Sequence, residues 1–132
     1  MDIALWVAQG LLAIAFLGSG FAKLTNDRLT YARIRPPMTS YAEDLSDRTF
    51  TTIGVLEVLG AIGVVFPRLL GIAPALTPLA AVGFVGLMIG AIITHLRRGE
   101  RQLIITNVVL MLLALFVAWG RGVEVLLGND AG

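Results

Sequence analysis

The chain alternates between long apolar stretches and short polar ones. Four stretches of about 17 to 20 residues are nearly free of charged side chains: 3–22, 50–66, 78–96 and 103–119. A membrane hydrocarbon core about 30 Å thick is crossed by roughly 20 residues of α-helix, so each stretch has the length of a membrane span. The pattern predicts an all-α integral membrane protein, a bundle of four transmembrane helices in a single domain over residues 1–132.

Residues that end or begin helices separate these stretches. Lys23 follows the first stretch, and Pro67, which lacks an amide proton, follows the second. Thr77 is predicted to cap the third helix, with Pro78 at its first position and Gly99 at its end. The first stretch is apolar like a secretory signal, but it begins without a basic residue and is longer than a signal core. We therefore expect a retained helix.

Composition and charge support a membrane protein and predict its orientation. Hydrophobic residues make up 57% of the chain and charged residues only 14%, far from the balance of a soluble domain. Eight of the ten Lys and Arg residues lie in the segments 23–48 and 97–101, which the positive-inside rule places in the cytoplasm. Both termini are then predicted to lie outside. This topology explains the basic residues, so we expect membrane lipids as partners and no nucleic acid.

Polar residues inside the predicted helices gather at one depth. Glu57 lies about seven residues, or roughly 10 Å, from the cytoplasmic end of the second helix. The other three helices bring polar residues to the same half of the membrane, and Gln9, near the outer end, is the exception. The candidate site, a buried polar layer or ligand-binding pocket, consists of Ser19, Lys23, Glu57, Thr94, His95 and Asn107.

Glycines recur at steps of three and four, which places them on one face of a helix. In the second helix they share the face of Glu57, and in the third they form a stripe that includes a GxxxG pattern. Small residues let helices approach closely in membranes, so these glycines are predicted to pack helix against helix. The predicted packing residues are Gly54, Gly60, Gly83, Gly86 and Gly90.

Two interpretations of the polar layer remain open. Glu57 could hydrogen-bond to Asn107 or Lys23 and fix the register of the helices, an interaction worth about 0.6 to 2 kcal/mol in membranes. Alternatively, Glu57 belongs to a proton-accepting or ligand-binding pocket with His95 as its partner, because an unpaired acid in the membrane costs roughly 2.5 to 3.5 kcal/mol. The pattern identifies no catalytic residue beyond acid–base chemistry at Glu57.

Missing residue types exclude several kinds of chemistry. The chain has no cysteine, which excludes a thiol relay, an iron–sulfur cluster and a disulfide. Its single histidine excludes a bis-histidine haem and a histidine-rich metal centre within one chain, so no metal site is predicted. What remains is acid–base chemistry or hydrogen bonding to a bound quinone or lipid.

The connection between the first and second helices is longer than a bundle needs. Its residues, 25–49, contain two consecutive prolines and a Ser40–Glu43 pair typical of a capping box, which predicts a short helix from Tyr41. Two interpretations apply to this segment. It is a plain amphipathic connector, or it forms a lid beneath the polar layer through Tyr31, Ile34, Met38 and Tyr41.

Several motifs occur in an order that resembles a known family. They are GSGFAKL at 18–24, IGVLEVLGAIGVVFP at 53–67, LTPLAAVGFVGLMIGAIITHLRRGE at 76–100 and NVVLMLLALFVAWGR at 107–121. Together they resemble the DoxX-like family of small four-helix membrane proteins over about residues 20–120. The resemblance implies a multi-pass protein of the bacterial inner membrane. By name, the family is grouped with subunits of a terminal quinol oxidase and a thiosulfate:quinone oxidoreductase, and it is also similar to eukaryotic membrane proteins that assist receptor assembly.

Two functions follow from the residues and the resemblance. In the first, the protein is redox-associated and binds a quinone or another isoprenoid or lipid in the cytoplasmic half, with Glu57 accepting a hydrogen bond or proton. In the second, it is a non-catalytic assembly or scaffold subunit of a larger complex, with a second copy or another membrane protein as partner. Whether the chain is an enzyme stays open, and an accessory subunit of a quinone-linked oxidoreductase fits the first interpretation.

Overall fold

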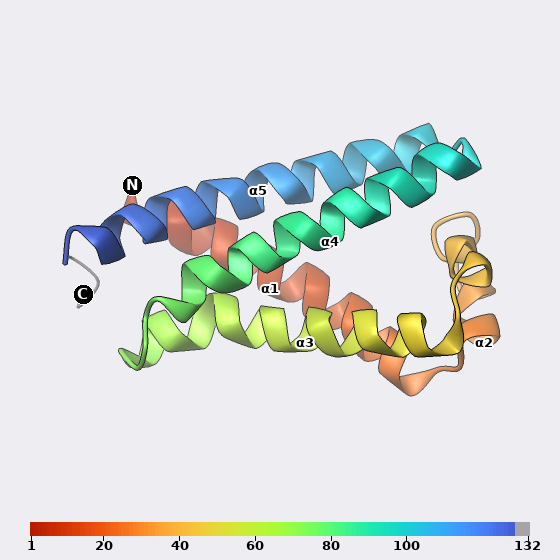
Figure 1. Ribbon diagram of the computed structural model, residues 1–132, viewed down its shortest axis with the longest axis horizontal. Helices are drawn as coiled ribbons and strands as arrows, with labels where there is room; N and C mark the ends of the chain where they lie inside the picture. The colour runs from red at the N-terminus through yellow and green to blue at the C-terminus, as the bar shows by residue number, and fades with distance from the viewer. Residues whose placement is uncertain (129–132) are drawn as a thin grey trace.

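The computed structural model describes residues 1–128, which contain no β-strand. Four long helices dominate the described chain: α1 (Asp2–Thr25), α3 (Asp47–Leu70), α4 (Leu76–Arg98) and α5 (Arg101–Leu126) (Figure 1). Each is long and apolar enough to cross a membrane. The predicted all-α bundle with four candidate membrane spans is therefore confirmed. Residues 129–132 of the predicted domain, including the C-terminus, lie outside the described part.

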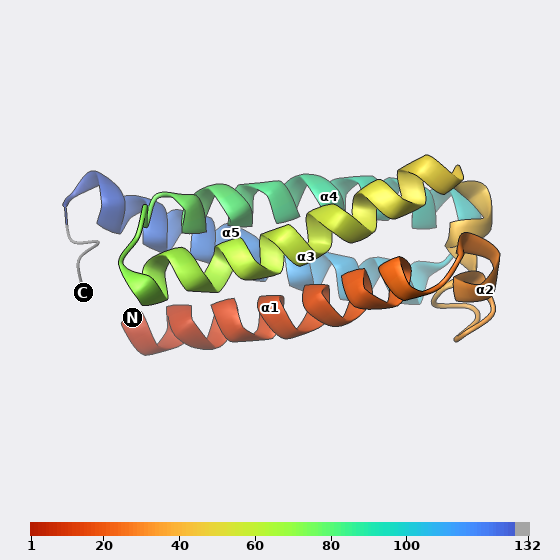
Figure 2. The same cartoon turned by 90° about the horizontal axis from the view of Figure 1, so that it is seen from below.

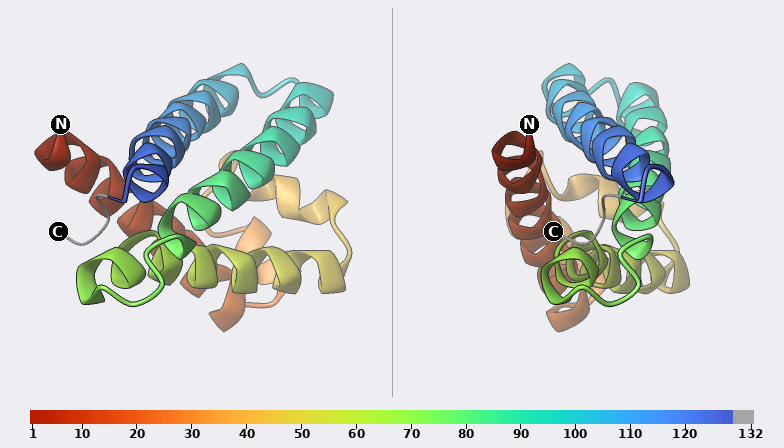
Figure 3. Two further views of the ribbon diagram at one scale, coloured as in Figure 1. Left: turned by 60° about the vertical axis from the view of Figure 1, so that its left-hand side comes forward. Right: turned by 90° about the vertical axis from the view of Figure 1, so that its left-hand side faces the viewer.

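The four long helices form a ring in which neighbours run antiparallel. α1 packs along α3 and α4 along α5, and the two pairs meet through α3 with α4 and through α1 with α5. The pairs diverge toward one end of the bundle (Figures 1 and 3). That end holds the short helices α2 (Arg28–Ala32) and η1 (Ser40–Asp44), and we call it the α2 end. The opposite end, where the N-terminus and the α3–α4 connection lie, is called the termini end (Figure 2).

Two stacked aromatic rings lie at the centre of the core. Phe16 of α1 and Phe84 of α4 have ring centroids 3.9 Å apart and an interplanar angle of 10°. They belong to one apolar cluster with the fully buried Leu12, Val64 and Val117. Because α1 and α4 belong to different pairs, this contact crosses the bundle and joins the two pairs. A smaller cluster at the α2 end consists of Tyr31, Ala32, Ala42 and Phe50.

The second long helix was predicted to end at Pro67, and this prediction is wrong. α3 continues through Pro67 to Leu70, and Gly71 with a positive φ of 67° ends it. A proline inside a helix leaves the carbonyl four residues earlier without its usual amide donor. Here that carbonyl belongs to Gly63, and the hydroxyl of Thr77 donates to it at 3.2 Å. The continued helix is therefore stabilised by a residue from the next one.

The same bond explains why Thr77 is not the predicted N-cap of the third long helix. α4 begins at Leu76, and Ala75 precedes it, so Thr77 already lies inside the helix with its side chain directed to α3. At its other end, α4 stops before Gly99 at a φ of 71°, which confirms the predicted end. α5 is longer than predicted, because it continues past residue 119 to Leu126.

The predicted capping box in the connection does not form. Ser40 is the first residue of η1, and its hydroxyl donates to the carbonyl of Pro37 at 3.0 Å instead of capping a helix. Ser46 is the residue that caps α3, accepting from the amide of Thr49 at 3.1 Å. The short helix predicted from Tyr41 is present as η1, one residue earlier and separate from α3.

Candidate functional site

A cavity of about 440 Å³ lies between the two helix pairs at the α2 end. All four long helices line it, as does the segment that contains α2 and η1. Its volume falls within the roughly 300–1,000 Å³ usual for small-molecule sites. The structure brings all six residues of the predicted polar layer to the wall of this one cavity: Ser19, Lys23, Glu57, Thr94, His95 and Asn107.

A buried ion pair lies on the α1–α3 side of the cavity. The ammonium nitrogen of Lys23 is 2.8 Å from Oε1 of Glu57, and the two residues are only 3% and 4% exposed. The same ammonium donates to the hydroxyl of Ser19 at 2.7 Å and to that of Tyr31 at 3.3 Å. An ammonium has three protons, so three partners account for all of its donors.

Glycines allow α1 and α3 to approach closely beside this ion pair. A Cβ atom on Gly20 would lie 2.8 Å from the carbonyl oxygen of Gly54, and one on Gly54 would lie 3.0 Å from Cβ of Lys23. Larger residues at these positions would push the helices apart and move Lys23 away from Glu57. The close approach of the two helices thus sets the position of the charged pair.

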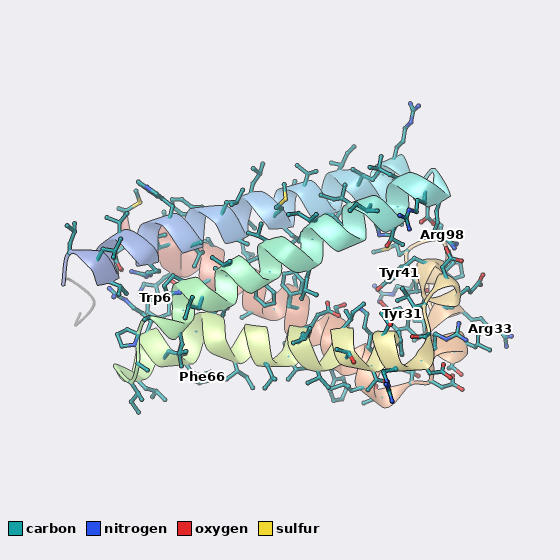
Figure 4. All side chains as sticks on the ribbon, in the orientation of Figure 1. Trp6, Tyr31, Arg33, Tyr41, Phe66 and Arg98 are labelled. Carbon is teal, nitrogen blue, oxygen red and sulfur yellow. The ribbon has the colours of Figure 1, made fainter. Side chains whose placement is uncertain are left out.

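Tyr31 and Tyr41 of the α2–η1 segment lie at the α2 end of the bundle (Figure 4), and both rings lie close to the Lys23 ammonium. The hydroxyls of Tyr31 and Tyr41 are 3.2 Å apart, and the ammonium of Lys23 lies 5.0 and 5.7 Å from the two ring centroids, within the range of a cation–π contact. Burial raises the pKa of the Tyr41 phenol, which keeps this hydroxyl protonated. Tyr31, Met38 and Tyr41 line the cavity as the lid interpretation expects, whereas Ile34 is not among its lining residues.

His95 has a different partner from the one predicted. Its Nδ1 lies 2.9 Å from Oε1 of Glu100, and its ring packs against Tyr41 with centroids 5.3 Å apart. The turn at Gly99 brings Glu100 back toward the end of α4, while Lys23 takes the place beside Glu57. The Glu57–His95 pairing of the second interpretation is therefore absent, and Glu57 is paired with Lys23, which is one of the two partners that the first interpretation offered.

Asn107 is one of two residues in the cavity wall with incomplete side-chain hydrogen bonding; the other is Glu57, whose Oε1 contacts Lys23 as an ion pair only. Asn107 is 9% exposed, and its side-chain Nδ2 has no hydrogen-bond partner among the described residues. Thr94, by contrast, donates to the carbonyl of Gly90 within its own helix at 3.0 Å. A buried amide without a partner costs free energy, so the Asn107 donor is the group in this wall that a ligand would satisfy.

Comparison with known proteins identifies the family. Residues 7–117 match the model of the DoxX-like family. The chain belongs to the DoxX-like family. The resemblance carried by the sequence motifs is confirmed, and with its four apolar helices this DoxX-like chain is a multi-pass membrane protein. Comparison with curated proteins and with solved structures found no match.

Residues 1–128 of this DoxX-like protein offer no cluster of three or more His, Asp or Glu side chains that could hold a metal ion. The acidic residues near the cavity each face a cation. Glu57 is paired with Lys23, and Glu100 with Arg98 at 3.1 Å as well as with His95. The chemistry that the cavity offers is therefore hydrogen bonding and proton exchange.

The five predicted packing glycines divide into two groups. Gly54 packs against α1, and a Cβ on Gly60 would lie 2.5 Å from the ring of Phe84, so both lie at close helix contacts. The stripe on α4 behaves differently. A Cβ on any of its three glycines would meet no heavy atom within 4 Å, so they do not pack against another helix of this chain. These residues are Gly83, Gly86 and Gly90.

The termini end holds a second buried polar cluster, which the sequence analysis missed. Arg121 is 1% exposed and donates to Gln9 at 2.7 Å, to Asp2 at 2.7 Å and to Glu124 at 2.8 Å. Arg68 reaches the same Glu124 at 3.0 Å. The sequence does contain a signal for this cluster. Steps of three and four residues place Gln9 on the face of its helix that carries Lys23, and Arg121 on the face that carries Asn107. By charge count alone, Arg68 and Arg121 are the two basic residues outside the predicted cytoplasmic segments, and this count does not predict that they are buried.

Proposed function

We propose that this DoxX-like protein binds a quinone, or another isoprenoid lipid with a carbonyl group, in the cavity at the α2 end. The observation that carries the proposal is the unpartnered, buried amide of Asn107 in the wall of a roughly 440 Å³ cavity between membrane-spanning helices. An amide N–H requires an acceptor, and a carbonyl oxygen on an otherwise apolar molecule supplies one without bringing a charge into the membrane.

The hydroxyl groups of the lid supply a second donor. One hydrogen bond joins the hydroxyls of Tyr31 and Tyr41, and it uses one of their two protons. The other proton remains for a ligand, because Lys23 only donates to this pair. A carbonyl oxygen placed between α5 and the lid would accept from both Asn107 and a phenol. In this proposal Glu57 neutralises Lys23 through their ion pair, and Lys23 orients the tyrosines.

The proposal includes a location and an orientation. We place the protein in a bacterial inner membrane with the α2 end in the cytoplasm and both termini outside, as the distribution of eight basic residues against two supports. A single cysteine at Arg33 should be protected from an impermeant thiol reagent in intact cells, whereas one at Leu127 should react. The reverse labelling would place the cavity in the outer half of the membrane.

The binding proposal is tested by extracting the ligand from protein purified in native membrane particles. Quantitative mass spectrometry should find about one quinone or isoprenoid lipid per chain beyond the ratio in the surrounding membrane. Asn107→Leu should lose this excess, while Leu112→Val, a change at a 56% exposed position of the same helix, should retain it. A wild-type extract with no more isoprenoid than bulk membrane would contradict the proposal.

A second candidate function is that of an assembly subunit of a larger membrane complex. The exposed glycine stripe of α4 favours it, because exposed small residues at steps of three and four suit close approach by a foreign helix. Under this alternative a specific membrane protein should copurify with the chain, and its yield should fall in Gly86→Leu. Recovery of the lone chain with a stoichiometric lipid would argue against it.

A further inference from the structure

A second hollow lies outside the cavity, between α3 and α4 toward the termini end. It measures about 620 Å³, and only residues of these two helices line it. We call it the α3–α4 groove. Its walls include Leu56 and Leu59 on one side and Leu76 and Leu79 on the other, side chains that are 47 to 62% exposed. In a membrane, this groove faces the acyl chains of the bilayer.

The groove and the cavity are neighbours along α4. Gly86 and Leu87 line both of them, so the two hollows come close to each other at this point of α4. The glycines on either side, Gly83 and Gly90, have open space where a side chain would begin. From His95 in the cavity to Leu76 in the groove, α4 extends over 19 residues, or roughly 29 Å, which is close to the thickness of the hydrocarbon core.

We propose that the α3–α4 groove binds the long polyprenyl chain of the ligand whose carbonyl head occupies the cavity. This inference rests on the proposed function and specifies its ligand class: a polyprenyl quinone or a similar long-chain isoprenoid, and not a short or unchained ring compound. The chain leaves the cavity at Gly86 and Leu87 and follows the glycine stripe toward the termini end.

The shared wall decides between this occupant and others. A foreign helix in the groove would leave the Asn107 donor unsatisfied, because a helix some 10 Å wide cannot enter the cavity. A bulk phospholipid whose acyl chain filled the groove could bring an ester carbonyl to Asn107 only by placing its charged headgroup in the buried cavity as well, which is costly. A molecule with an apolar chain and a neutral hydrogen-bond acceptor at one end would fill the groove with its chain and accept from Asn107 in the cavity with its head. Its methyl branches have room along a stripe that lacks side chains at Gly83, Gly86 and Gly90.

We expect the groove to determine where the prenyl chain lies and which chain shapes fit, and to add little to the binding free energy. Lipid chains are as apolar as the leucines of the groove, so transfer of a prenyl chain from bilayer to groove gains little hydrophobic free energy. The appropriate measurement therefore locates the chain directly. A benzoquinone with a long polyprenyl chain and a terminal diazirine serves as the probe, in phosphatidylcholine nanodiscs that contain the full-length protein.

On illumination, the probe should label the peptides that contain residues 56–63 and 76–87. An excess of the same ring with a single isoprene unit should suppress this labelling by displacing the head group. Gly83→Leu fills open space and should abolish the groove label while leaving binding of the one-isoprene compound unchanged. Gly18→Leu is the matched control, since it adds the same side chain to an equally open position of α1, and the label should persist.

The outcomes separate this inference from the proposed function. If the one-isoprene compound binds wild type but not Asn107→Leu, and Gly83→Leu does not reduce the groove label, the cavity proposal stands and the groove inference is overturned. Groove labelling that excess one-isoprene quinone does not suppress would also overturn it, because the occupant would then be an independent lipid. If neither quinone binds wild-type protein, both proposals fail together.

Discussion

The two ends of the bundle bury charged side chains in opposite ways. At the termini end, Arg121 is bound by groups from α1 and α5, and Gln9 extends the network to the carbonyl of Val64 on α3 at 2.7 Å. At the α2 end, Lys23 and Glu57 form a comparably buried pair, but they line a cavity that also holds an unpartnered amide. Buried charge alone therefore does not identify a ligand site. The adjacent cavity does, because buried side-chain atoms without a hydrogen-bond partner among residues 1–128 occur at both ends: Nδ2 of Asn107 at the α2 end, and Nη1 of Arg68 and Nη2 of Arg121 at the termini end.

The difference follows from how the helix pairs diverge. The pairs are joined near Phe16 and Phe84, and toward the termini end an arginine side chain is long enough to connect them. Toward the α2 end the pairs separate, and the tyrosines of the lid close the gap only in part (Figure 4). A buried charged side chain is thus structural where the helix pairs converge, and it lines a cavity that a ligand could enter where they diverge.

The largest expected effect comes from breaking the network at the termini end. Arg121→Leu leaves Asp2 and Glu124 without their shared partner, and removal of one member of a buried ionic cluster costs about 3–5 kcal/mol. Unfolding in detergent, followed by circular dichroism, should show this loss. Arg97→Leu, at an exposed position of α4, is the control and should change stability little. A small effect of Arg121→Leu would mean that this end tolerates buried charge as the cavity does.

Breaking the ion pair at the α2 end should cost less. Glu57→Leu breaks the buried ion pair with Lys23, but water entering the cavity can solvate the ammonium that remains, so the loss should stay below the about 3–5 kcal/mol expected when a buried charge is left uncompensated. The double variant Lys23→Met with Glu57→Leu should be more stable than either single variant, which a double-mutant cycle measures. If Glu57→Leu proved more damaging than Arg121→Leu, the contrast between the two ends would be reversed.

Asn107→Leu should stabilise the protein, whereas the two preceding substitutions should destabilise it. Without a ligand, the side-chain amide is buried and unpartnered, so an apolar residue of similar size should raise the stability of the ligand-free protein by up to about 1 kcal/mol. Thermal unfolding of lipid-stripped protein measures this change. Together with the loss of ligand expected for the same variant, it would show that Asn107 serves binding at the expense of stability. A destabilised variant would instead assign Asn107 to helix packing.

The smallest effect is expected at the lid. Arg98 joins α4 to η1 by donating to Asp44 at 2.7 Å and to Ser40 at 3.1 Å, and Asp44 is about half exposed. Exposed ion pairs contribute about 0.2–1 kcal/mol, so Asp44→Ala should leave the unfolding temperature almost unchanged. Hydrogen exchange should nevertheless become faster across residues 26–46. Unaltered exchange there would show that the tyrosine contacts alone hold the lid.

The sequence predicted the parts of this structure that depend on one helix at a time. The four spans, the end of α4 at Gly99 and the common depth of Lys23, Glu57 and Asn107 follow from hydropathy and from 3.6-residue spacing. Partner choice does not follow from them. Lys23 meets Glu57 because Gly20 and Gly54 bring α1 against α3, and nothing in either helix alone states that they are neighbours.

Other errors arose where a second segment changed the outcome of a local rule. A proline such as Pro67 normally ends a helix, because the carbonyl four residues earlier loses its amide donor. Here the hydroxyl of Thr77 donates to that carbonyl, which belongs to Gly63, and Thr77 therefore does not act as the predicted helix cap. The glycine stripe of α4 was predicted to pack against another helix, but the helix pairs diverge, and no side chain in the described part of the chain packs against these glycines. Each of these residues was identified as special, and only the three-dimensional arrangement shows how it is used.

The stacked rings of Phe16 and Phe84 also bear on membrane permeability. They lie in an apolar layer with Leu12, Val64 and Val117, between the polar cavity at one end and the arginine cluster at the other. Proton conduction requires an unbroken chain of hydrogen-bonding groups or water, and closely packed hydrocarbon supplies neither. This apolar cluster, which extends from Ala8 to Phe16 along α1, therefore separates the ionised groups at the two ends of the bundle, and we expect it to block proton conduction between them.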